Sequence, residues 1–382
     1  MEGKRLIEKI RLRNILSFGD KGEEIQLEPL NIIIGQNASG KSNLVDVLKL
    51  LHALTQDKGL VNFISKSGGI SEWIWKGEQN KGEAEVNILG FFYNVNTGYK
   101  IKFKEDFFGI FITDEEINNY DKKQKVKRKQ TIEVFRKNNE RITGDESILS
   151  SSGAYLSVEV MDAFFSLTSF FKRMEVYSDL QTTRGSEIRR PQVPDAPNDF
   201  LLEDASNLAL VLNDLQFRGK PKDKVIENLK KFYPQAKDYF IQVVGGTVQL
   251  FIREEDLEKP ISAMRLSDGT LRYLCLLAIL CHPEPPPLIC IEEPETGLHP
   301  DILPTIAELM KEASQRTQLI VTTHSDILVS AFSDMPEAVL VCEKDENGTH
   351  FRRLEAEKLK TWLEEYTLGE AWLRGAIGGT RW

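Results

Sequence analysis

The chain has 382 residues, of which 41% are hydrophobic and 28% are charged. This ordinary globular mix excludes a largely disordered chain, and the length excludes a small disulfide-stapled scaffold. Acidic residues number 58 against 49 lysines and arginines, which gives a net charge of −9. Any contact with nucleic acid must therefore come from a local basic patch and not from the overall charge.

The apolar runs and the cysteines indicate the cellular setting. The longest purely apolar run, Leu274 to Cys281, is far shorter than the roughly 20 residues that span a bilayer. The N-terminal residues lack the apolar segment of a signal peptide, and the four cysteines show no CxxC spacing. We therefore expect a reduced, cytoplasmic setting, without a membrane contact or structural zinc.

The first third of the chain predicts strands around one helix. Alternating or fully apolar runs predict strands over 6–16, 24–27, 30–34, 84–92 and 99–103. Asn96 to Gly98 is the expected turn between the last two. Apolar residues at helical spacing, from Leu44 to Leu54, predict an amphipathic helix that begins near Lys41.

A basic run interrupts the acidic chain between residues 120 and 141. Six positive charges fall within eight positions: Lys122, Lys123, Lys125, Lys127, Arg128 and Lys129. Without them the remaining net charge is −9 − 6, about −15. An arm that contacts phosphates and a solvated loop tip both fit this pattern.

The rest of the chain alternates between helix and strand. Helical periodicity covers 155–171, 207–215 and 223–232, strands are expected at 239–244 and 248–252, and 184–198 is an expected extended loop. In the final third we expect a helix at 267–281, a strand at 288–291, a helix at 301–314 and a strand at 318–322. This alternation is the pattern of a parallel α/β sheet. The sequence shows no internal repeat and no heptad run.

A phosphate-binding loop follows the strand at 30–34. Its pattern is G-x-x-x-x-G-K-S, made by Gly35, Gln36, Asn37, Ala38, Ser39, Gly40, Lys41 and Ser42. Small residues let backbone N–H groups wrap phosphates at a helix N-terminus. Lys41 would reach the β- and γ-phosphates, and Ser42 would bind Mg²⁺.

Two later strands end in residues that suit phosphate chemistry. Glu292 and Glu293 follow the buried strand at 288–291, so Glu292 would hold Mg²⁺ and Glu293 would act as general base on the attacking water. An exposed acidic loop is the alternative. His324 follows the strand at 318–322 and would sense the γ-phosphate, although a cap or core histidine is the more frequent role of such a residue taken alone.

A second anion site is expected at the start of the helix at 267–281. Ser267, Asp268 and Gly269 precede this helix and would offer backbone N–H groups to a phosphate. One chain cannot easily place two helix N-termini on opposite sides of one γ-phosphate. We therefore expect this segment to complete the site of another subunit.

The order of these motifs resembles the ABC-type ATPase heads. Residues 266–270 are similar to the signature motif, Glu292 and Glu293 to the Walker B end, 295–301 to the D-loop and His324 to the switch histidine. The segment from Arg11 to Phe18 and the loop ending in Asn43 resemble the SMC/RecF-like branch. The phrase from Glu292 to Pro300 and the ending from Trp372 to Trp382 resemble RecF-like or OLD-like bacterial ATPases, which often occur with a Toprim-type nuclease or another effector in phage defence.

Two departures from the ABC pattern stand out. The Walker B acid is Glu292 where ABC proteins usually have aspartate, which would lengthen the reach to Mg²⁺ and slow turnover. A Q-loop glutamine is hard to place: Gln79 is a candidate, but a surface loop fits it better.

The C-terminal segment does not fit a second catalytic domain. Only 58 residues follow His324, too few for a Toprim domain. Residues 339–348 fit a hairpin better than an acidic metal site.

The resemblance implies an α/β, SMC/RecF-like P-loop ATPase head with a mixed or parallel sheet, an N-terminal antiparallel β region and an inserted, mainly helical subdomain. We expect residues 1–105 and 260–382 to form a discontinuous ATPase domain, 106–142 a basic arm or hairpin, and 143–259 the inserted subdomain.

The function this implies is an Mg²⁺-dependent ATPase whose heads dimerise around ATP. It would couple nucleotide state to nucleic-acid surveillance and to a separate nuclease or toxin in phage defence. A nucleotide-gated scaffold with slow hydrolysis and a RecF-like repair ATPase are the alternatives, and a transporter motor is disfavoured by the SMC-like N-terminus.

Overall fold

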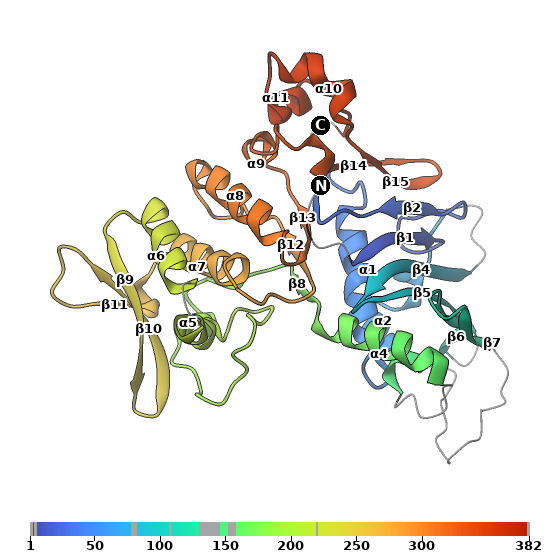
Figure 1. The fold of residues 1–382 in the computed structure, drawn as a ribbon, viewed down its shortest axis with the longest axis horizontal. Coiled ribbons are helices and arrows are strands. Elements are labelled where there is room, and N and C mark those ends of the chain that lie inside the picture. The colour runs from blue at the N-terminus through green and yellow to red at the C-terminus, as the bar shows by residue number, and fades with distance from the viewer. Residues whose placement is uncertain are drawn as a thin grey trace.

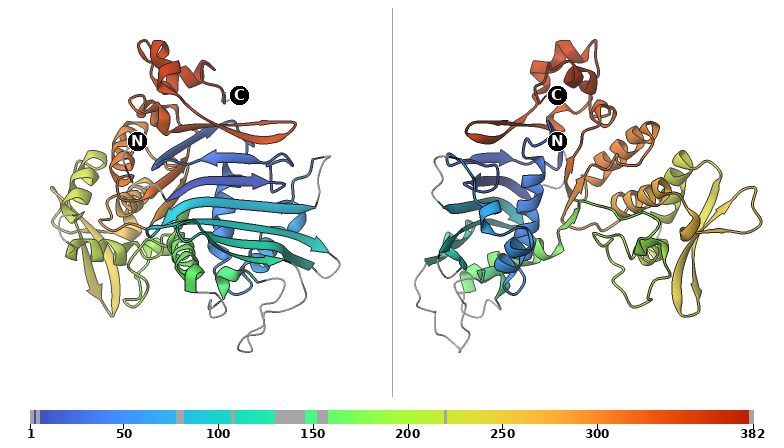
Figure 2. Two further views of the ribbon diagram at one scale, coloured as in Figure 1. Left: turned by 45° about the vertical axis from the view of Figure 1, so that its right-hand side comes forward. Right: turned by 180° about the vertical axis from the view of Figure 1, so that it is seen from behind.

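A computed structural model describes residue 3 and residues 6–77, 82–106, 109–129, 146–151, 158–218 and 221–379. Within these ranges the chain forms a central sheet with a second large sheet on one side and a helical lobe on the other (Figure 1). The C-terminal hairpin at 339–353 lies along the N-terminal strand at 23–26, and the C-terminal helices lie beyond this hairpin at the top of the views in Figure 2.

The central sheet has the order β15-β14-β3-β13-β12-β8. Its strands are β3 (Leu30–Gly35), β8 (Glu175–Tyr177), β12 (Leu288–Glu292), β13 (Gln318–Thr322), β14 (Val339–Asp345) and β15 (Gly348–Arg353). All neighbours are parallel except β15, which returns antiparallel on β14. The predicted hairpin over 339–348 and the predicted strands at 30–34, 288–291 and 318–322 are confirmed.

The second sheet is antiparallel, with the order β2-β1-β4-β5-β6-β7. Its strands are β1 (Ile7–Arg13), β2 (Glu23–Gln26), β4 (Glu83–Phe92), β5 (Val95–Asp106), β6 (Gly109–Asn119) and β7 (Gln124–Lys129). The turn predicted at Asn96 to Gly98 is wrong, because these residues lie within β5. Tyr93 and Asn94 make the turn instead, and both have the positive φ angles that tight hairpins require.

Two hydrophobic cores cover the two faces of the central sheet. Alternation along each strand divides its side chains, so Ile33 joins one core and Ile32 the other. The first core holds the inner face of the antiparallel sheet with α1 (Lys41–Ala53), α2 (Gly59–Lys66), α3 (Ile70–Trp73) and α4 (Val158–Arg173). This core places α1 directly behind β3, where the phosphate loop begins.

The second core is built around α7 (Asp268–Leu280), which is buried on all sides from Thr270 to Leu280. Around it pack α5 (Leu208–Phe217), α6 (Pro221–Phe232), α8 (Leu303–Ala313) and α9 (Asp326–Ser330). A small antiparallel sheet covers this lobe, formed by β9 (Ala236–Val244), β10 (Thr247–Glu254) and β11 (Ile261–Ser262). At the C-terminal end lie α10 (Ala356–Leu363) and α11 (Leu368–Leu373).

Candidate functional site

The predicted motifs meet at one edge of the central sheet. Because β3, β13, β12 and β8 are parallel neighbours, their carboxyl ends lie side by side. The register pairs Ile33 with Thr322, and Thr322 with Glu292. Residues 35–42, the Glu292–Glu293 pair and His324 therefore emerge from adjacent strands although up to 289 positions separate them (324 − 35).

The phosphate loop forms an open cradle at the start of α1. Gly40 is the residue before the helix, has a φ of 111° and offers no side-chain cap, so the first N–H groups of α1 are left for a ligand. Gln36, Asn37, Ala38 and Ser42 are exposed, whereas the Ser39 hydroxyl is buried without a hydrogen-bond partner. This loop fits a phosphate group.

Lys41 lies under the loop. Its Nζ donates to the carbonyls of Gly35 and Gln36, each at 2.8 Å. Burial lowers the pKa of this ammonium, although the nearby negative charge of Glu293 acts in the opposite direction. A cation held by two carbonyls in a buried place can turn to an incoming phosphate, which supplies stronger, charged acceptors.

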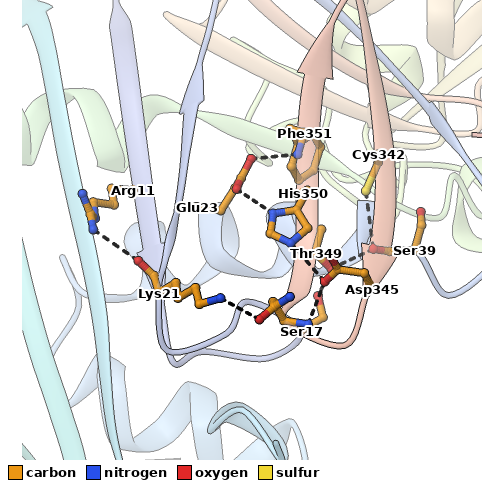
Figure 3. A network of polar contacts seen from close by, with 11 residues as sticks. Arg11, Ser17, Lys21, Glu23, Ser39, Cys342, Asp345, Thr349, His350 and Phe351 are labelled. Carbon is orange, nitrogen blue, oxygen red and sulfur yellow. Dashed lines mark hydrogen bonds and ion pairs between the residues drawn. The ribbon is translucent and has the colours of Figure 1, made fainter. Parts of the chain in front are cut away.

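The β14–β15 hairpin holds the back of the phosphate loop. Thr349 donates its hydroxyl to the Ser39 carbonyl at 2.7 Å, and the Cys342 thiol donates to the same carbonyl at 3.5 Å (Figure 3). Gly40 must be glycine here, because a Cβ would lie 2.3 Å from the Thr349 hydroxyl. The hairpin is in turn tied to β2 through His350, whose ring lies between Glu23 (3.0 Å) and Asp345 (3.2 Å).

Glu293 and His324 face each other at the ends of β12 and β13. The Nε2 of His324 lies 3.8 Å from the carboxylate of Glu293. Glu293 has a φ of 45°, and its N–H donates to the Thr322 carbonyl at 2.9 Å. A left-handed conformation is strained for glutamate, and such strain concentrates at functional sites. The pair can polarise a water molecule beside a phosphate.

Glu295 is a site residue that the motif reasoning did not single out. Its carboxylate accepts the Thr323 hydroxyl at 2.7 Å and the His324 N–H at 2.8 Å, while its other oxygen is buried without a partner. Burial raises the pKa of Glu295, and the two hydrogen bonds lower it in part. Glu295 thus joins the D-loop region to the end of β13 and fixes the backbone that carries His324.

Asp46 is a second such residue. It lies one helical turn after Ser42 on α1 and near enough to Glu292 that the two negative charges interact. Burial raises its pKa, and the charge of Glu292 raises it further. Its position four residues after Ser42, on the same face of α1, is the sequence signal that could have identified Asp46. A serine hydroxyl with two carboxylates is a donor set of hard oxygens, which fits Mg²⁺.

The signature segment lies on the other face of the central sheet from α1. Ser267 caps α7 by accepting the Thr270 N–H at 3.0 Å, and both Ser267 and Asp268 are exposed. Gly269 packs closely on the D-loop region, because a Cβ there would lie 2.9 Å from the Gly297 carbonyl. The segment therefore presents a free surface away from the phosphate loop of its own chain.

Arg189 fixes the signature segment from behind. It lies in a short 3₁₀ turn within the predicted loop at 184–198, and its guanidinium is almost fully buried. It donates to the carbonyls of Thr182, Thr183, Ala263 and Leu266 and pairs with Asp268. No sequence signal marks this residue, since its role depends on long-range contacts.

A cavity of about 390 Å³ opens beside the phosphate loop, next to Asn43. Trp75, Ile74 and Leu16 supply apolar wall, and the polar rim is made by Ser17, Asn43, Glu72, Lys76 and Lys344. Asn43 donates to the Ser17 hydroxyl at 2.6 Å, which joins the cavity to the loop. A larger hollow of about 740 Å³ between α6 and α8 contains none of the predicted site residues.

The Q-loop candidate, Gln79, for which a surface loop is the better fit, lies outside the described residues. The sheet order points to another segment, because β8 is the parallel neighbour of β12 and pairs Tyr177 with Ile291. The residues that follow β8 therefore emerge at the same edge as Glu292. Gln181 is exposed in this segment, four residues after the strand ends.

The basic run forms the turn and edge strand β7 of the antiparallel sheet. Lys122 pairs with Asp162 on α4, and Lys125 pairs with Glu116. The backbone register sets Lys127, Arg128 and Lys129 opposite Glu116, Glu115 and Asp114; the side chains of these three basic residues lie outside the described part. The run is therefore matched by an acidic strand, which lowers the positive potential that a polyanion would meet.

Comparisons with known proteins bear on the family and the fold of this chain. A family model described as "AAA domain, putative AbiEii toxin, Type IV TA system" (AAA_21) matches residues 30–330. The Old nuclease of Escherichia phage P2 is 32% identical over 127 residues, which are 30% of this chain and 21% of that protein. The chain thus spans about a fifth of the length of this curated relative.

Solved structures of SMC heads share the fold. The SmcHead bound to the C-winged helix domain of ScpA aligns with a TM-score of 0.59 at 17% identity, over 92% of this chain and 99% of that one. A Pyrococcus furiosus Smc head domain bound to the C-terminal domain of ScpA gives 0.56 at 16% identity, over 94% and 99%. The expected fold, an SMC-like α/β head with an N-terminal antiparallel region, is confirmed. Within the described ranges, none of the helices is both long and apolar enough to cross a membrane.

Proposed function

Because this chain belongs to the AAA_21 family of ABC/SMC-like ATPases, we propose that it binds and hydrolyses ATP at the edge formed by β3, β13 and β12. The observation that carries this proposal is the meeting of Lys41, Glu293 and His324 there. The loop N–H groups from Gly35 to Asn43 would hold the phosphates, and Lys41 would leave its two carbonyls for the β- and γ-phosphates. Glu293 would accept the proton of the attacking water, and His324 would contact the γ-phosphate.

Mg²⁺ would be held by Ser42 and Glu292, with Asp46 as a further carboxylate, and would neutralise charge on the phosphates. In this proposal Glu293 and His324 mark the γ-phosphate side of the site. The nucleotide must then extend the other way, past Asn43, into the cavity lined by Trp75. An aromatic wall with a polar rim suits a nucleobase, which offers a flat face and polar edges.

We further propose that two copies pair around ATP. The cradle at Gly40 leaves one side of the phosphates open, while Ser267, Asp268 and Gly269 face outward on the opposite face of the sheet. A partner's signature segment would close the site over the γ-phosphate, so ATP would favour the closed pair and hydrolysis would release it.

The proposed biological output is control of a separate effector in phage defence, linked to nucleic-acid surveillance. Its support is the family, whose description names a toxin system, and the similarity to part of the Old nuclease. Lys123, which is exposed in the turn of the basic run and has no ion pair within the described residues, would be the first point of contact with a polyanion. The acidic residues opposite β7 reduce the positive potential of the rest of the run.

Nucleotide binding and single-turnover hydrolysis test the enzyme proposal. Lys41→Met should abolish ATP binding, whereas Glu293→Gln should keep binding and lose hydrolysis. Glu346→Gln, in the exposed turn of the β14–β15 hairpin, is the matched control and should behave as wild type. Rapid turnover by Glu293→Gln would refute the assigned base.

A slowly hydrolysing scaffold is the second candidate. The longer Glu292 side chain at the Walker B position and the engagement of Lys41 by loop carbonyls both favour it. Fast single-turnover hydrolysis by the purified wild-type chain would exclude a passive scaffold. Hydrolysis that is slow but lost in Glu293→Gln would support it.

A further inference from the structure

The C-terminal module, defined as residues 356–379, reaches the phosphate loop. Gly379 lies against the first glycine of that loop: a Cβ on Gly379 would lie 3.4 Å from the Cα of Gly35 and 2.7 Å from a methyl group of Val341. Gly35 is thus enclosed from two directions, since its own Cβ would meet the Cys342 carbonyl of β14 at 2.2 Å. Backbone approaches this close are possible only for glycine.

Three hydrogen bonds hold this contact in place. The Gly379 N–H donates to the Glu343 carboxylate at 2.8 Å, and the Gly379 carbonyl accepts the Trp372 indole N–H at 2.6 Å. Arg352 donates to the Ile377 carbonyl at 2.7 Å. The N–H and the carbonyl of Gly379 are therefore both held by hydrogen bonds, which keep this turn in contact with Gly35. Its φ of 57° is strained for any residue with a side chain.

The same module also contacts the element that follows His324. A Cβ on Gly369, in α11, would lie 2.0 Å from the Asp326 carbonyl at the start of α9. The Leu368 N–H donates to the Ser333 hydroxyl at 2.8 Å just beyond α9. The module therefore bridges the phosphate loop and the helix that begins two residues after His324; Figure 1 shows α11 next to this helix, α9.

We propose that residues 377–379 are a strap that positions the phosphate loop, with Gly379 as the positioning residue. The link works in both directions. The Gly35 carbonyl accepts Lys41 at 2.8 Å, so phosphates that draw Lys41 away change the residue that the strap touches. By linkage, if bound nucleotide changes the affinity of α10 and α11 for a partner, that partner changes the affinity for nucleotide by the same factor. This inference rests on the proposed nucleotide site and adds a route by which a partner on the module could control it.

Binding of the fluorescent analogue mant-ATP with Mg²⁺ tests the strap. Gly379→Ala should raise the Kd at least about tenfold, because the methyl group presses on Val341 and Gly35 and the φ is strained. Gly246→Ala is the matched control: its φ is also positive, 79°, but no atom lies within 4 Å of the added methyl group. The control should bind mant-ATP as wild type does.

A second variant and a spectroscopic readout separate positioning from general damage. Trp372→Phe keeps a buried ring but removes the donor to Gly379, and it should raise the Kd in the same direction. In wild type, the indole N–H resonance of Trp372, assigned by its loss in Trp372→Phe, should shift when mant-ATP binds. An unshifted resonance together with wild-type affinity in Gly379→Ala would overturn the strap. Wild-type protein that does not bind mant-ATP would instead overturn the proposed function, and the strap with it.

Discussion

Replacing Arg189 tests how the signature segment is held. In Arg189→Met the long side chain still fills the buried space, but the donors to four backbone carbonyls and the partner of Asp268 are lost. The neighbouring Arg190 offers a matched control, since it pairs with Glu187 at the surface, where both side chains are 60% exposed.

The magnitude follows from burial. Only 4% of the Arg189 side chain is exposed, and removing one member of a buried charged network typically costs about 3–5 kcal/mol. Asp268 is 58% exposed and can be solvated, and methionine removes the cost of desolvating a guanidinium, so we expect the lower end, about 3 kcal/mol. An exposed pair such as Arg190 and Glu187 contributes about 0–0.5 kcal/mol.

Urea unfolding and two activity readouts check this prediction. Arg189→Met should unfold at lower urea with an unchanged m-value, and Arg190→Met should match wild type. In the folded range, Arg189→Met should bind ATP normally in its own phosphate loop but lose ATP-driven turnover. Equal stability of the two variants, or normal turnover in Arg189→Met, would refute the role given to this arginine.

Three further predictions concern separate parts of the chain. Burial, aided by the charge of Glu203, raises the pKa of Glu175 to about 7. The folded state thus binds a proton that the unfolded state releases, so stability should fall as pH rises from about 4.5 to 7, by up to about 3 kcal/mol. Glu175→Gln should flatten this part of the pH–stability curve, and an unchanged curve would contradict the assignment. Glu295→Ala removes the acceptor for the Thr323 hydroxyl and the His324 N–H. The kcat for ATP hydrolysis should fall roughly 10–100-fold with little change in KM. An effect confined to KM would argue against the positioning of His324 by Glu295. Trp75→Ala should weaken ATP binding by about tenfold through lost stacking while leaving inorganic tripolyphosphate binding unchanged. Phe217→Ala, which removes a 77% exposed aromatic ring on α5, is the control. Equal losses for ATP and tripolyphosphate would contradict a base site at Trp75.

The sheet and the motifs on it could be predicted because their signals are local. Parallel strands buried on both faces appear as short apolar runs, which is why 30–34, 288–291 and 318–322 were identifiable. Each run ends in polar residues, so the edge that gathers Lys41, Glu293 and His324 follows from the motif order alone. The turn at Tyr93 and Asn94 could not be found this way, because a tyrosine with positive φ is not a usual turn signal.

Residues whose role depends on distant contacts left no such signal. Arg189 and Gly379 act on segments 77 and 344 positions away (266 − 189 and 379 − 35), through backbone atoms that any sequence provides. The sequence placed Glu295 in the D-loop region, and only the structure connects its carboxylate to the His324 N–H. The basic run was visible, but its acidic partner strand was not, since register is a tertiary property.

The mass of Glu293→Gln with and without ATP tests the central claim most directly. If heads pair around nucleotide, this hydrolysis-deficient variant should be monomeric alone and should double in mass with ATP and Mg²⁺. Adding Ser267→Arg, which places a bulky charge on the exposed signature surface, should keep ATP binding but prevent the doubling. A Glu293→Gln variant that binds ATP and stays strictly monomeric would contradict the claim.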